Sequence, residues 1–459
     1  MRIAVIKPPP HPGTIRMERL ISVEPLELEY LYSALKEYHP LIIDCSRTRK
    51  NPLKQITSFQ PDLIVITAYI THLEWVLCFS EKMKRAEHQP IIFVGGPHAE
   101  VCPEHFFSAH IDAVFFAGQL TALNKSIERL ELGQPYHDIP GVATASGAQF
   151  QRCEGLTNPD LKLPAPERIF FNPNPGKYFY LQYKRCAAVK TALGCPGCCS
   201  FCFCRHMNGG RYSPRQIEDV ITEIESLDAD SILFVGDNFL VNPSRLLAFA
   251  DLVHERGIEK NFIAYGTAAF VVNHPDVVLA LKNAGLNALI IGFEFIDDDE
   301  LKSVRKGATV ADNIRAAAIL DQLGLDLVAL FIISPRYSHD HFRRLARFIR
   351  QNPIYAATFS TETLLPGAEN FSSPDPFDNH DSIIKNSWRY DLLRLHEKPK
   401  HMSAPLFYCW LYYLYLMPYL SPKKALRLAR NFSFSGAIIA FTKAAFTGIE
   451  YLLKLLFWH

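Results

Sequence analysis

The sequence predicts an α/β protein built from two successive parallel-sheet units, a doubly wound domain followed by a partial (β/α)6 barrel, with an apolar, mainly helical C-terminal region. Three observations predict this class. Short apolar runs alternate with stretches of helical length through residues 1–368. Within each run the apolar residues are consecutive, without polar residues between them, which is typical of strands covered on both faces. Beyond residue 368 the rhythm stops, and residues 404–420 form an apolar run without a charge.

The first unit, which we place at residues 1–134, contains five such runs. Stretches 25–37 and 73–84 between them have the length of helices. Doubly wound domains bind ligands beyond the carboxyl ends of their strands. No G-x-G-x-x-G follows the first run, which disfavours a dinucleotide. We expect the strands at residues 3–6, 41–43, 63–66, 91–94 and 113–116.

Residues 135–184 are rich in proline, asparagine and aromatic residues, and we expect them to form an irregular connection. The second unit, residues 185–368, resumes the strand–helix rhythm, and in such barrels the active site lies at the carboxyl ends of the strands. Pro214, Pro243 and Pro275 stand where helices should begin, because proline suits a first helical turn. We expect strands at 188–193, 232–235, 262–265, 288–292, 327–333 and 356–361, and helices at 214–226, 243–255, 275–283, 310–323 and 341–351.

The composition excludes some classes of protein. Lys+Arg is 48 against Asp+Glu 47, so a strongly basic nucleic-acid binder is excluded and we expect no nucleic-acid partner. The opening residues reach Pro8 before any long apolar stretch, so we expect no signal peptide. Clustered cysteines favour a reducing, cytoplasmic setting over a disulfide framework. The 32 Phe and 19 Tyr indicate an aromatic-lined cavity or an apolar surface.

Five of the 11 cysteines fall between residues 195 and 204, directly after the first expected barrel strand. Cys195, Cys199 and Cys202 have C-x3-C-x2-C spacing, which can present three thiolates to a cubane iron–sulfur cluster. One iron then stays open, as in catalytic rather than structural metal sites. A zinc site that includes His206 and a redox pair of adjacent cysteines are the alternatives. Cys198 and Cys204 receive no role.

These motifs resemble those of the radical S-adenosylmethionine (SAM) superfamily. The cysteine loop opening a (βα)6 barrel, together with Gly-Gly-Pro-His at 95–98 in an upstream Rossmann-like domain, resembles the subgroup with an N-terminal cobalamin-binding domain. Gly-Phe-Glu at 292–294 and Leu-Leu-Pro-Gly at 364–367 are similar to motifs of the same superfamily. Asp-Asn-Phe-Leu at 237–240 and the region of Glu24 resemble the hopanoid C-3 methylase type.

The resemblance implies a [4Fe–4S] cluster, SAM and cobalamin as cofactors, with a flavodoxin or ferredoxin as electron donor. It implies that a 5′-deoxyadenosyl radical is generated, and that a methyl group passes to an sp3 carbon of an apolar substrate, a lipid or a polycyclic molecule. A radical SAM cyclase or other non-methylating chemistry is the alternative within the superfamily. A non-catalytic iron–sulfur or corrinoid-binding module is the alternative from another class.

The resemblance also implies residues that contact the cofactors. The SAM-contacting candidates are Phe201, Asp237, Asn238 and Glu294. Asp237 could instead cap a helix, and Glu294 could pair with Arg305 or Lys306. From their positions at strand ends, Tyr265 and Ser334 could line the cavity, and Phe203 could join Phe201 in shielding the cluster. No side chain is assigned to the hydrogen-transfer chemistry itself.

For cobalamin the candidates are Thr67, Gly95, Gly96, Pro97, His98 and Gly118. The chain lacks Asp-x-His-x-x-Gly, so cobalt would be bound without a protein imidazole. Where relatives carry Gly-Glu-Gly-Glu, residues 117–120 read Ala-Gly-Gln-Leu, with one glycine and no carboxylate. His98 could instead be a hydrogen-bonding residue of a turn.

The C-terminal region, residues 369–459, differs in character. Residues 404–420 carry no charge, and 434–458 are largely apolar. The first run contains Pro418 and is short for spanning a bilayer, so a buried helix covering the barrel is one interpretation. An element at a membrane interface or along an apolar substrate channel is the other. The basic run 423–430 favours peripheral contact with the inner face of the membrane.

Overall fold

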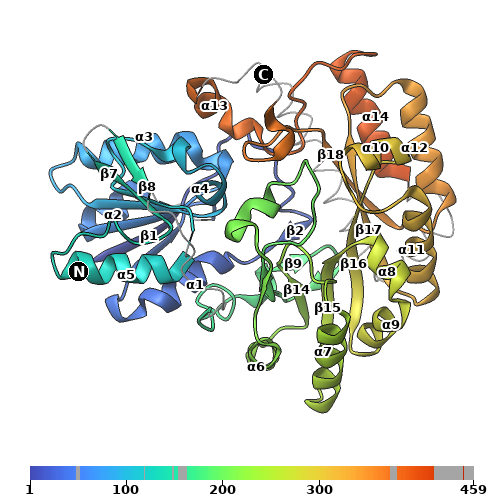
Figure 1. The fold of residues 1–459 in the computed structure, drawn as a ribbon, viewed down its shortest axis with the longest axis horizontal. Helices are drawn as coiled ribbons and strands as arrows, with labels where there is room; N and C mark the ends of the chain where they lie inside the picture. Colours follow the sequence, from blue (N-terminus) through green and yellow to red (C-terminus); the bar gives the residue numbers. More distant parts are fainter. Residues whose placement is uncertain are drawn as a thin grey trace.

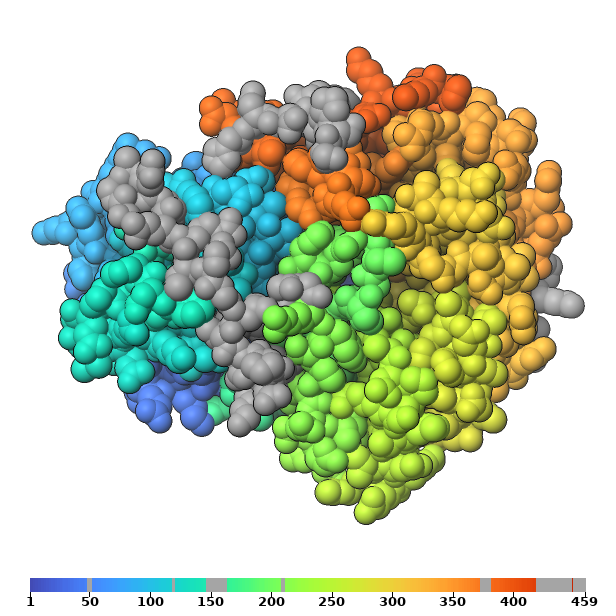
Figure 2. Space-filling view, in the orientation of Figure 1, coloured from blue at the N-terminus to red at the C-terminus, as the bar shows by residue number. Residues whose placement is uncertain are grey.

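A computed structural model describes residues 1–47, 52–117, 119–146, 149–152, 163–372, 380–417 and 448. Figure 1 shows two α/β units, one coloured blue to cyan and one green to orange. A segment coloured orange, which includes α13 (His380–Asn386), lies across the top of both units in the space-filling view (Figure 2). The predicted fold class is confirmed.

The first unit is a doubly wound sheet with strand order β3-β1-β4-β5-β6-β7-β8. Neighbours among the first five strands pair in parallel. Alternate residues of β1 enter different core clusters, Ile3 and Val5 in one and Ala4 and Ile6 in the other, so both faces are covered. The strands are β1 (Ile3–Lys7), β3 (Leu41–Asp44), β4 (Leu63–Thr67), β5 (Ile91–Gly95) and β6 (Ala113–Phe115), and the helices are α1 (Leu26–Leu35), α2 (Pro52–Phe59), α3 (Leu73–Lys84), α4 (Pro97–Val101) and α5 (Gln119–Glu131).

The expectation of an irregular connection over residues 135–184 is wrong for the parts that pair. β7 (Val142–Ser146) and β8 (Gln149–Arg152) form a hairpin that extends the first sheet antiparallel to β6. β9 (Phe179–Tyr180) pairs with β2 (Ile21–Ser22) and β10 (Tyr183–Lys184). Edge strands with small and polar residues and two-residue ladders leave little hydrophobic pattern in the sequence.

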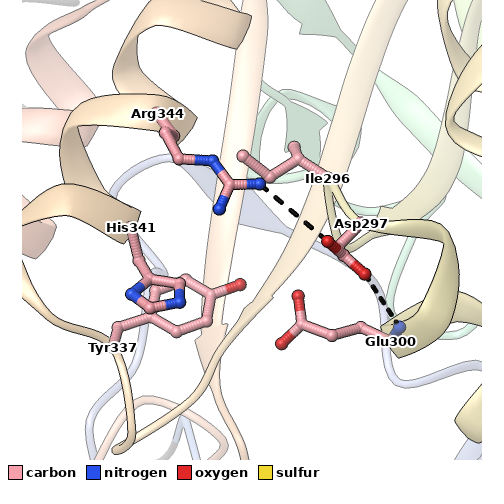
Figure 3. Close-up of a pocket in the computed structure, with 6 residues that line it drawn as sticks. All are labelled: Ile296, Asp297, Glu300, Tyr337, His341 and Arg344. Carbon is pink, nitrogen blue, oxygen red and sulfur yellow. Dashed lines mark hydrogen bonds and ion pairs between the residues drawn. The ribbon is translucent and has the colours of Figure 1, made fainter.

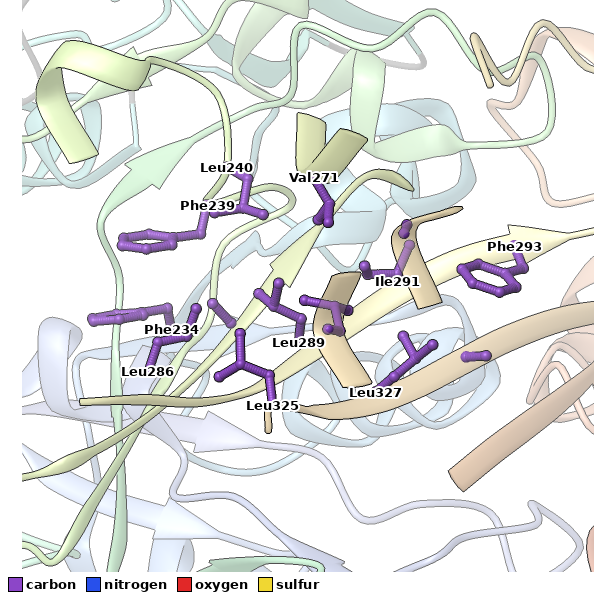
Figure 4. Close-up of a cluster of buried hydrophobic side chains, with 14 of the residues drawn as sticks. Phe234, Phe239, Leu240, Val271, Leu286, Leu289, Ile291, Phe293, Leu325 and Leu327 are labelled. Carbon is purple, nitrogen blue, oxygen red and sulfur yellow. The ribbon is translucent and has the colours of Figure 1, made fainter. Parts of the chain in front are cut away.

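The second unit is a six-stranded partial barrel whose parallel strands lie in the order β11-β14-β15-β16-β17-β18. Phe234, Leu289 and Ile291 belong to the large core between its strands and outer helices (Figure 4). The strands are β11 (Cys186–Val189), β14 (Ser231–Phe234), β15 (Asn261–Gly266), β16 (Leu286–Glu294), β17 (Asp326–Ile333) and β18 (Ala356–Thr361), and the helices are α6 (Ile217–Ser226), α7 (Pro243–Glu255), α8 (Ala268–Asn273), α9 (Pro275–Asn283), α10 (Asp298–Ser303), α11 (Val310–Gln322) and α12 (His339–Gln351).

Pro243 and Pro275 occupy first helical turns as predicted, but Pro214 does not. Pro214 lies in β13 (Ser213–Pro214), which pairs with β12 (Ala192–Leu193), and α6 begins only at Ile217. The strand expected at 188–193 is therefore two strands, β11 and β12, with a break between them. A proline is tolerated in this short two-stranded ladder because it sits at an edge.

A buried ion-pair network joins the two units around Arg168. Its guanidinium lies 2.8 Å from Glu24 of the first unit and 2.5 Å from Glu223 of α6. Glu29 of α1 lies 3.6 Å away. Arg215 adds a second cation 2.6 Å from Glu223, and burial raises the pKa of Glu24. These groups balance one another in a site that excludes water, so each depends on the others.

The described part of the C-terminal region covers the barrel at its last strand. α14 (Ala404–Leu416) packs against α12 and β18, and the Trp410 ring stacks on Phe342. The Tyr415 hydroxyl lies 3.3 Å from the Phe359 amide and 3.2 Å from its carbonyl, so it bonds the outer edge of β18. No helix among the described residues is long and apolar enough to cross a bilayer. Residues 418–447 and 449–459 lie outside the described part.

Replacing Arg168 with methionine is expected to lower the free energy of unfolding by about 3–5 kcal/mol, because Glu24 and Glu29 would lose their buried counter-charge and Glu223 would keep only Arg215. Chemical denaturation of the purified protein measures this. Arg256→Met is the matched control, since Arg256 pairs with Glu225 at 3.5 Å on the surface and such a pair contributes less than about 1 kcal/mol. Equal losses in the two variants would contradict the assignment.

Candidate active site

The cysteine loop leaves the barrel at the carboxyl end of its first strands through Gly194. This glycine has φ +72°, and a Cβ placed on it would lie 2.0 Å from the Arg211 carbonyl oxygen. Only glycine fits both conditions. The turn brings Cys195 to the mouth of the barrel, and the loop continues into η5 (Phe203–Gly210). The predicted position of the loop at the strand ends is therefore observed.

The Cys195, Cys199 and Cys202 thiols are half-buried and interact electrostatically with one another. Their three sulfur atoms do not all lie within 4.8 Å of one another. Among the described residues, only one group of at least three His, Cys, Asp or Glu side chains has its ligand atoms that close together, and it lies elsewhere. Thiolates around a single zinc ion would lie about 4 Å apart. At least two of the three thiols are therefore more than 4.8 Å apart, and His206 is exposed, so both observations disfavour the zinc alternative. Cys198 and Cys199 are both free thiols.

The two unassigned cysteines differ in their surroundings. Cys198 is exposed, and its thiol lies 3.8 Å from the Arg305 carbonyl oxygen. Cys204 donates a hydrogen bond to Cys202, which lowers the pKa of Cys202 to about 7 and raises that of Cys204. Cys204 also bonds Asp237, whose pKa is raised by burial. Cys204 and Asp237 thus form a chain of hydrogen bonds that ends on Cys202, one of the three predicted cluster ligands.

A buried ion pair, one of the two that the sequence offered for Glu294, lies beside the cysteines. Lys306 Nζ is 2.7 Å from Glu294 Oε1, and only 12% of the Lys306 side chain is exposed. Burial lowers the pKa of Lys306, but Glu294 and Cys199 outweigh it and the net shift is upward. A register shift in β16 and φ +60° at Glu294 aim its carboxylate at Lys306, and a Cβ at Gly292 would collide with both.

The other SAM-contacting candidates lie around this pair. Lys306 sits over the Phe201 ring at 5.9 Å. Asn238 accepts a hydrogen bond from the Leu240 amide, forming a local turn. Asp237 does not cap the next helix, because Asn242 does. The pKa of Tyr265 is raised, mainly by burial and further by the nearby Cys204 thiol. Ser334 is buried, and its hydroxyl donates a hydrogen bond to Glu362.

On the side of the first unit, the predicted cobalamin residues follow β4 and β5. Gly95, Gly96 and Pro97 are partly exposed, and a Cβ at Gly96 (φ +100°) would lie 2.7 Å from the Ala68 amide. Thr67 is buried. The backbone therefore forms this edge without side chains, which suits the close approach of a large planar ligand. His98 is buried and points inward to His105, and Gly118 lies outside the described residues.

The two groups of residues face each other. α4, which begins directly after Gly96, packs against η5 of the cysteine loop. Tyr69, 42% exposed after β4, interacts electrostatically with Cys204. Lys7, at the end of β1, pairs with Glu27 at 2.6 Å. Tyr69 and Lys7 were not singled out from the sequence, although their positions at the ends of parallel strands are the signal that could have found them.

The loop that follows β18 closes over the cysteine loop. Glu369 accepts from Arg205 at 2.8 Å and from Arg305, and the Asn370 amide donates to the Ser200 carbonyl oxygen. At its start, a Cβ at Gly367 would collide with Val101 of α4. This loop therefore contacts both units at once. The Leu-Leu-Pro-Gly motif, residues 364–367, forms the start of this loop and so lies where the two units meet.

A separate cavity of about 250 Å³ lies between α10 and α12 (Figure 3). Its polar groups have local partners. Asp297 caps α10 and lies 3.9 Å from Arg344, and the Tyr337 ring stacks on His341, which bonds Ser338. Asp297, Arg344 and His341 of this cavity therefore have structural roles as helix-capping or ion-pairing residues.

Comparison with known proteins defines the class. Residues 189–349 match the family described as the radical SAM superfamily, and residues 17–124 match the B12 binding domain. The chain therefore carries a B12 binding domain followed by a radical SAM domain. Its cofactors are a [4Fe–4S] cluster, SAM and cobalamin. Three half-buried thiols at the mouth of the barrel match the donor set of the first, and the partly exposed Gly95–Gly96 edge leaves backbone open to the last.

Three similar proteins illustrate the group. The hopanoid C-3 methylase of Methylococcus capsulatus is 22% identical over 79% of this chain and 71% of its own length. An uncharacterized methyltransferase of Pyrococcus horikoshii is 25% identical over 92% and 93%. The radical SAM methyltransferase TsrM of Kitasatospora setae, solved with cobalamin and a [4Fe–4S] cluster bound, shares the fold at TM-score 0.62 and 16% identity over 80% and 77%. The predicted resemblance to the hopanoid C-3 methylase type is confirmed.

Replacing Cys195, Cys199 or Cys202 singly with alanine is expected to remove the cluster, because three ligands are the minimum that holds it. Iron, sulfide and visible absorption of protein purified without oxygen measure this. Cys198→Ala is the matched control and keeps the full iron content, since its thiol is exposed and turned toward Arg305. Iron lost from the control, or kept by any of the other three variants, would refute the ligand set.

Replacing Lys306 with methionine is expected to lower the midpoint potential of the cluster, because a buried positive charge that favours the reduced form is removed. A unit charge several ångströms away corresponds to a shift on the order of 100 mV. Redox titration followed by electron paramagnetic resonance measures it. Lys302→Met, which removes a 77% exposed charge from the preceding helix, leaves the potential unchanged. Equal shifts in both variants would show that Lys306 has no special role.

Proposed function

We propose that this enzyme transfers a methyl group to an sp3 carbon of an apolar substrate, a lipid or polycyclic molecule. The observation that carries the proposal is the packing of α4 against η5. It sets the edge formed by Gly95 and Gly96 opposite the cysteine loop, so both cofactor sites open toward one space. A methyl group held on one side can then reach a carbon activated from the other.

The bound cofactors supply the difficult chemistry, a carbon radical from the cluster and SAM and a transferable methyl group from cobalamin. The chain holds and orients them. Cys195, Cys199 and Cys202 hold the cluster, and Lys306 with Glu294 offers both signs of charge to the carboxylate and amine of SAM. Thr67, Gly95, Gly96, Pro97 and His98 belong to the strand ends that would hold the corrinoid, with Tyr69 facing the cysteine loop.

The ion pairs of Glu369 with Arg205 and Arg305 tie the loop after β18 to the cysteine loop. Arg205 and Arg305 also leave positive charge at the outer side of this loop. Such charge suits an acidic electron donor such as a flavodoxin or ferredoxin.

The substrate class rests on apolar surface outside the barrel. Leu406, Tyr412, Tyr413 and Leu416 of α14 are each more than a third exposed, whereas Phe407, Leu411 and Leu414 of the same helix are buried. A methylase of a hopanoid is among the similar proteins. We propose that this face of α14 rests on the membrane surface, at the cytoplasmic side, from which an apolar substrate reaches the barrel.

The test is turnover with SAM that carries a deuterated methyl group. The label is expected in the product, with two SAM consumed per methyl transferred, one to methylate cobalamin and one to form 5′-deoxyadenosine. Product formed without label identifies non-methylating chemistry such as cyclisation. Absence of any 5′-deoxyadenosine under reducing conditions identifies a non-catalytic binding module. Either result would overturn the proposal.

The same assay tests the role of α14. Tyr413→Glu is expected to lower turnover at least tenfold when substrate is presented in anionic vesicles, and to leave it unchanged when substrate is dispersed in detergent. Glu255→Lys, on the surface of α7, is the control for a change of charge away from this face. Equal loss in vesicles and detergent would remove the membrane contact from the proposal.

A further inference from the structure

We propose that His98, Cys102 and His105 form a zinc site in the cobalamin-binding unit, separate from the iron–sulfur cluster. Among the described residues this is the one group of at least three His, Cys, Asp or Glu side chains whose ligand atoms all lie within 4.8 Å of one another. All three residues are buried, with exposures of 6%, 4% and 8%. The proposal is independent of the reaction proposed above.

The local backbone brings the three side chains together. His98 and Cys102 are four residues apart across α4, so they lie on the same face of the helix. The Cys102 amide donates to the His98 carbonyl oxygen at 2.8 Å. At Cys102 the backbone leaves the helical region, and η3 (Pro103–Phe106) turns back so that His105 faces His98. A spacing of H-x3-C-x2-H thus converges on one point.

The distances suit a tetrahedral ion. His98 Nε2 lies 2.9 Å from His105 Nδ1. Bond lengths of about 2.0 Å to nitrogen and 2.3 Å to sulfur place two nitrogen ligands about 3.3 Å apart and nitrogen and sulfur about 3.6 Å apart. Side-chain shifts of a few tenths of an ångström to about 1 Å would admit the ion. Without an ion the two rings share a single hydrogen bond in an apolar setting, with Phe106 edge-on to His98.

The ligand types select the metal. Two imidazoles and a thiolate favour zinc, while magnesium and calcium require oxygen ligands. Three protein ligands leave a fourth position for water.

The position of the site gives it a structural role. α4 follows the Gly95–Gly96 edge directly and packs against η5. Cys102 Sγ would lie 3.3 Å from a Cβ at Gly367, in the loop that closes over the cysteine loop. An ion bound here fixes α4 and η3 to each other. It thereby holds the glycine edge in register with the cluster loop.

The test is metal analysis of full-length protein purified without oxygen. About one zinc per chain is expected beside the iron. Cys102→Ser and His105→Asn are each expected to lower zinc at least tenfold while iron stays unchanged. Cys45→Ser, which changes another buried thiol of the same unit, keeps zinc. The triple alanine variant of Cys195, Cys199 and Cys202 loses iron and keeps zinc.

Zinc K-edge absorption of the unsubstituted protein gives a second readout that does not depend on any variant folding. Two nitrogen ligands and one sulfur ligand are expected. Absence of zinc, a sulfur-only first shell, or zinc that disappears with the cluster cysteines would overturn the proposal, the last by showing that zinc merely replaces iron.

Discussion

The buried network around Arg168 is the interaction on which the rest of the structure depends. It reaches α1 through Glu29, α6 through Glu223 and the first barrel strand through Ala188. Because β11 leads into the cysteine loop, the network sets where that loop lies relative to the cobalamin-binding unit. Burying five charged groups is costly unless each is paired, which ties the geometry of the two units to one arrangement.

In that arrangement, each of the two units contributes its own set of cofactor-binding groups. The barrel contributes thiols and the Lys306–Glu294 pair at the carboxyl ends of its strands, and the first unit contributes a bare backbone edge at the ends of β4 and β5. Parallel sheets collect functional groups at these ends. Two such edges facing each other bring the two cofactor sites together.

The sequence carried the local information and little of the long-range kind. Covered strands appear as apolar runs, so α3 was predicted at 73–84 and is observed at Leu73–Lys84. The Arg168 network joins residues more than 100 positions apart, and nothing in the sequence pairs them. The sequence offered both Arg305 and Lys306 as partners for Glu294. In the fold, Lys306 pairs with Glu294, whereas Arg305 pairs with Glu369. Pro214 misled because a proline marks an edge strand as well as a helix start.

A six-stranded barrel is open, and both of its edge strands need partners for their outward backbone groups. Side chains supply them. At β11, the Ala188 amide donates to Glu24 and its carbonyl oxygen accepts from Arg168. At β18, the Tyr415 hydroxyl serves the amide and the carbonyl oxygen of Phe359 in the same way. One edge is thus closed by the cofactor-binding unit and the other by the apolar helix α14. The described part of the aromatic C-terminal region therefore belongs to the barrel. The face of α14 that seals β18 is fixed by packing, and the opposite face of the same helix is left as an exposed apolar surface.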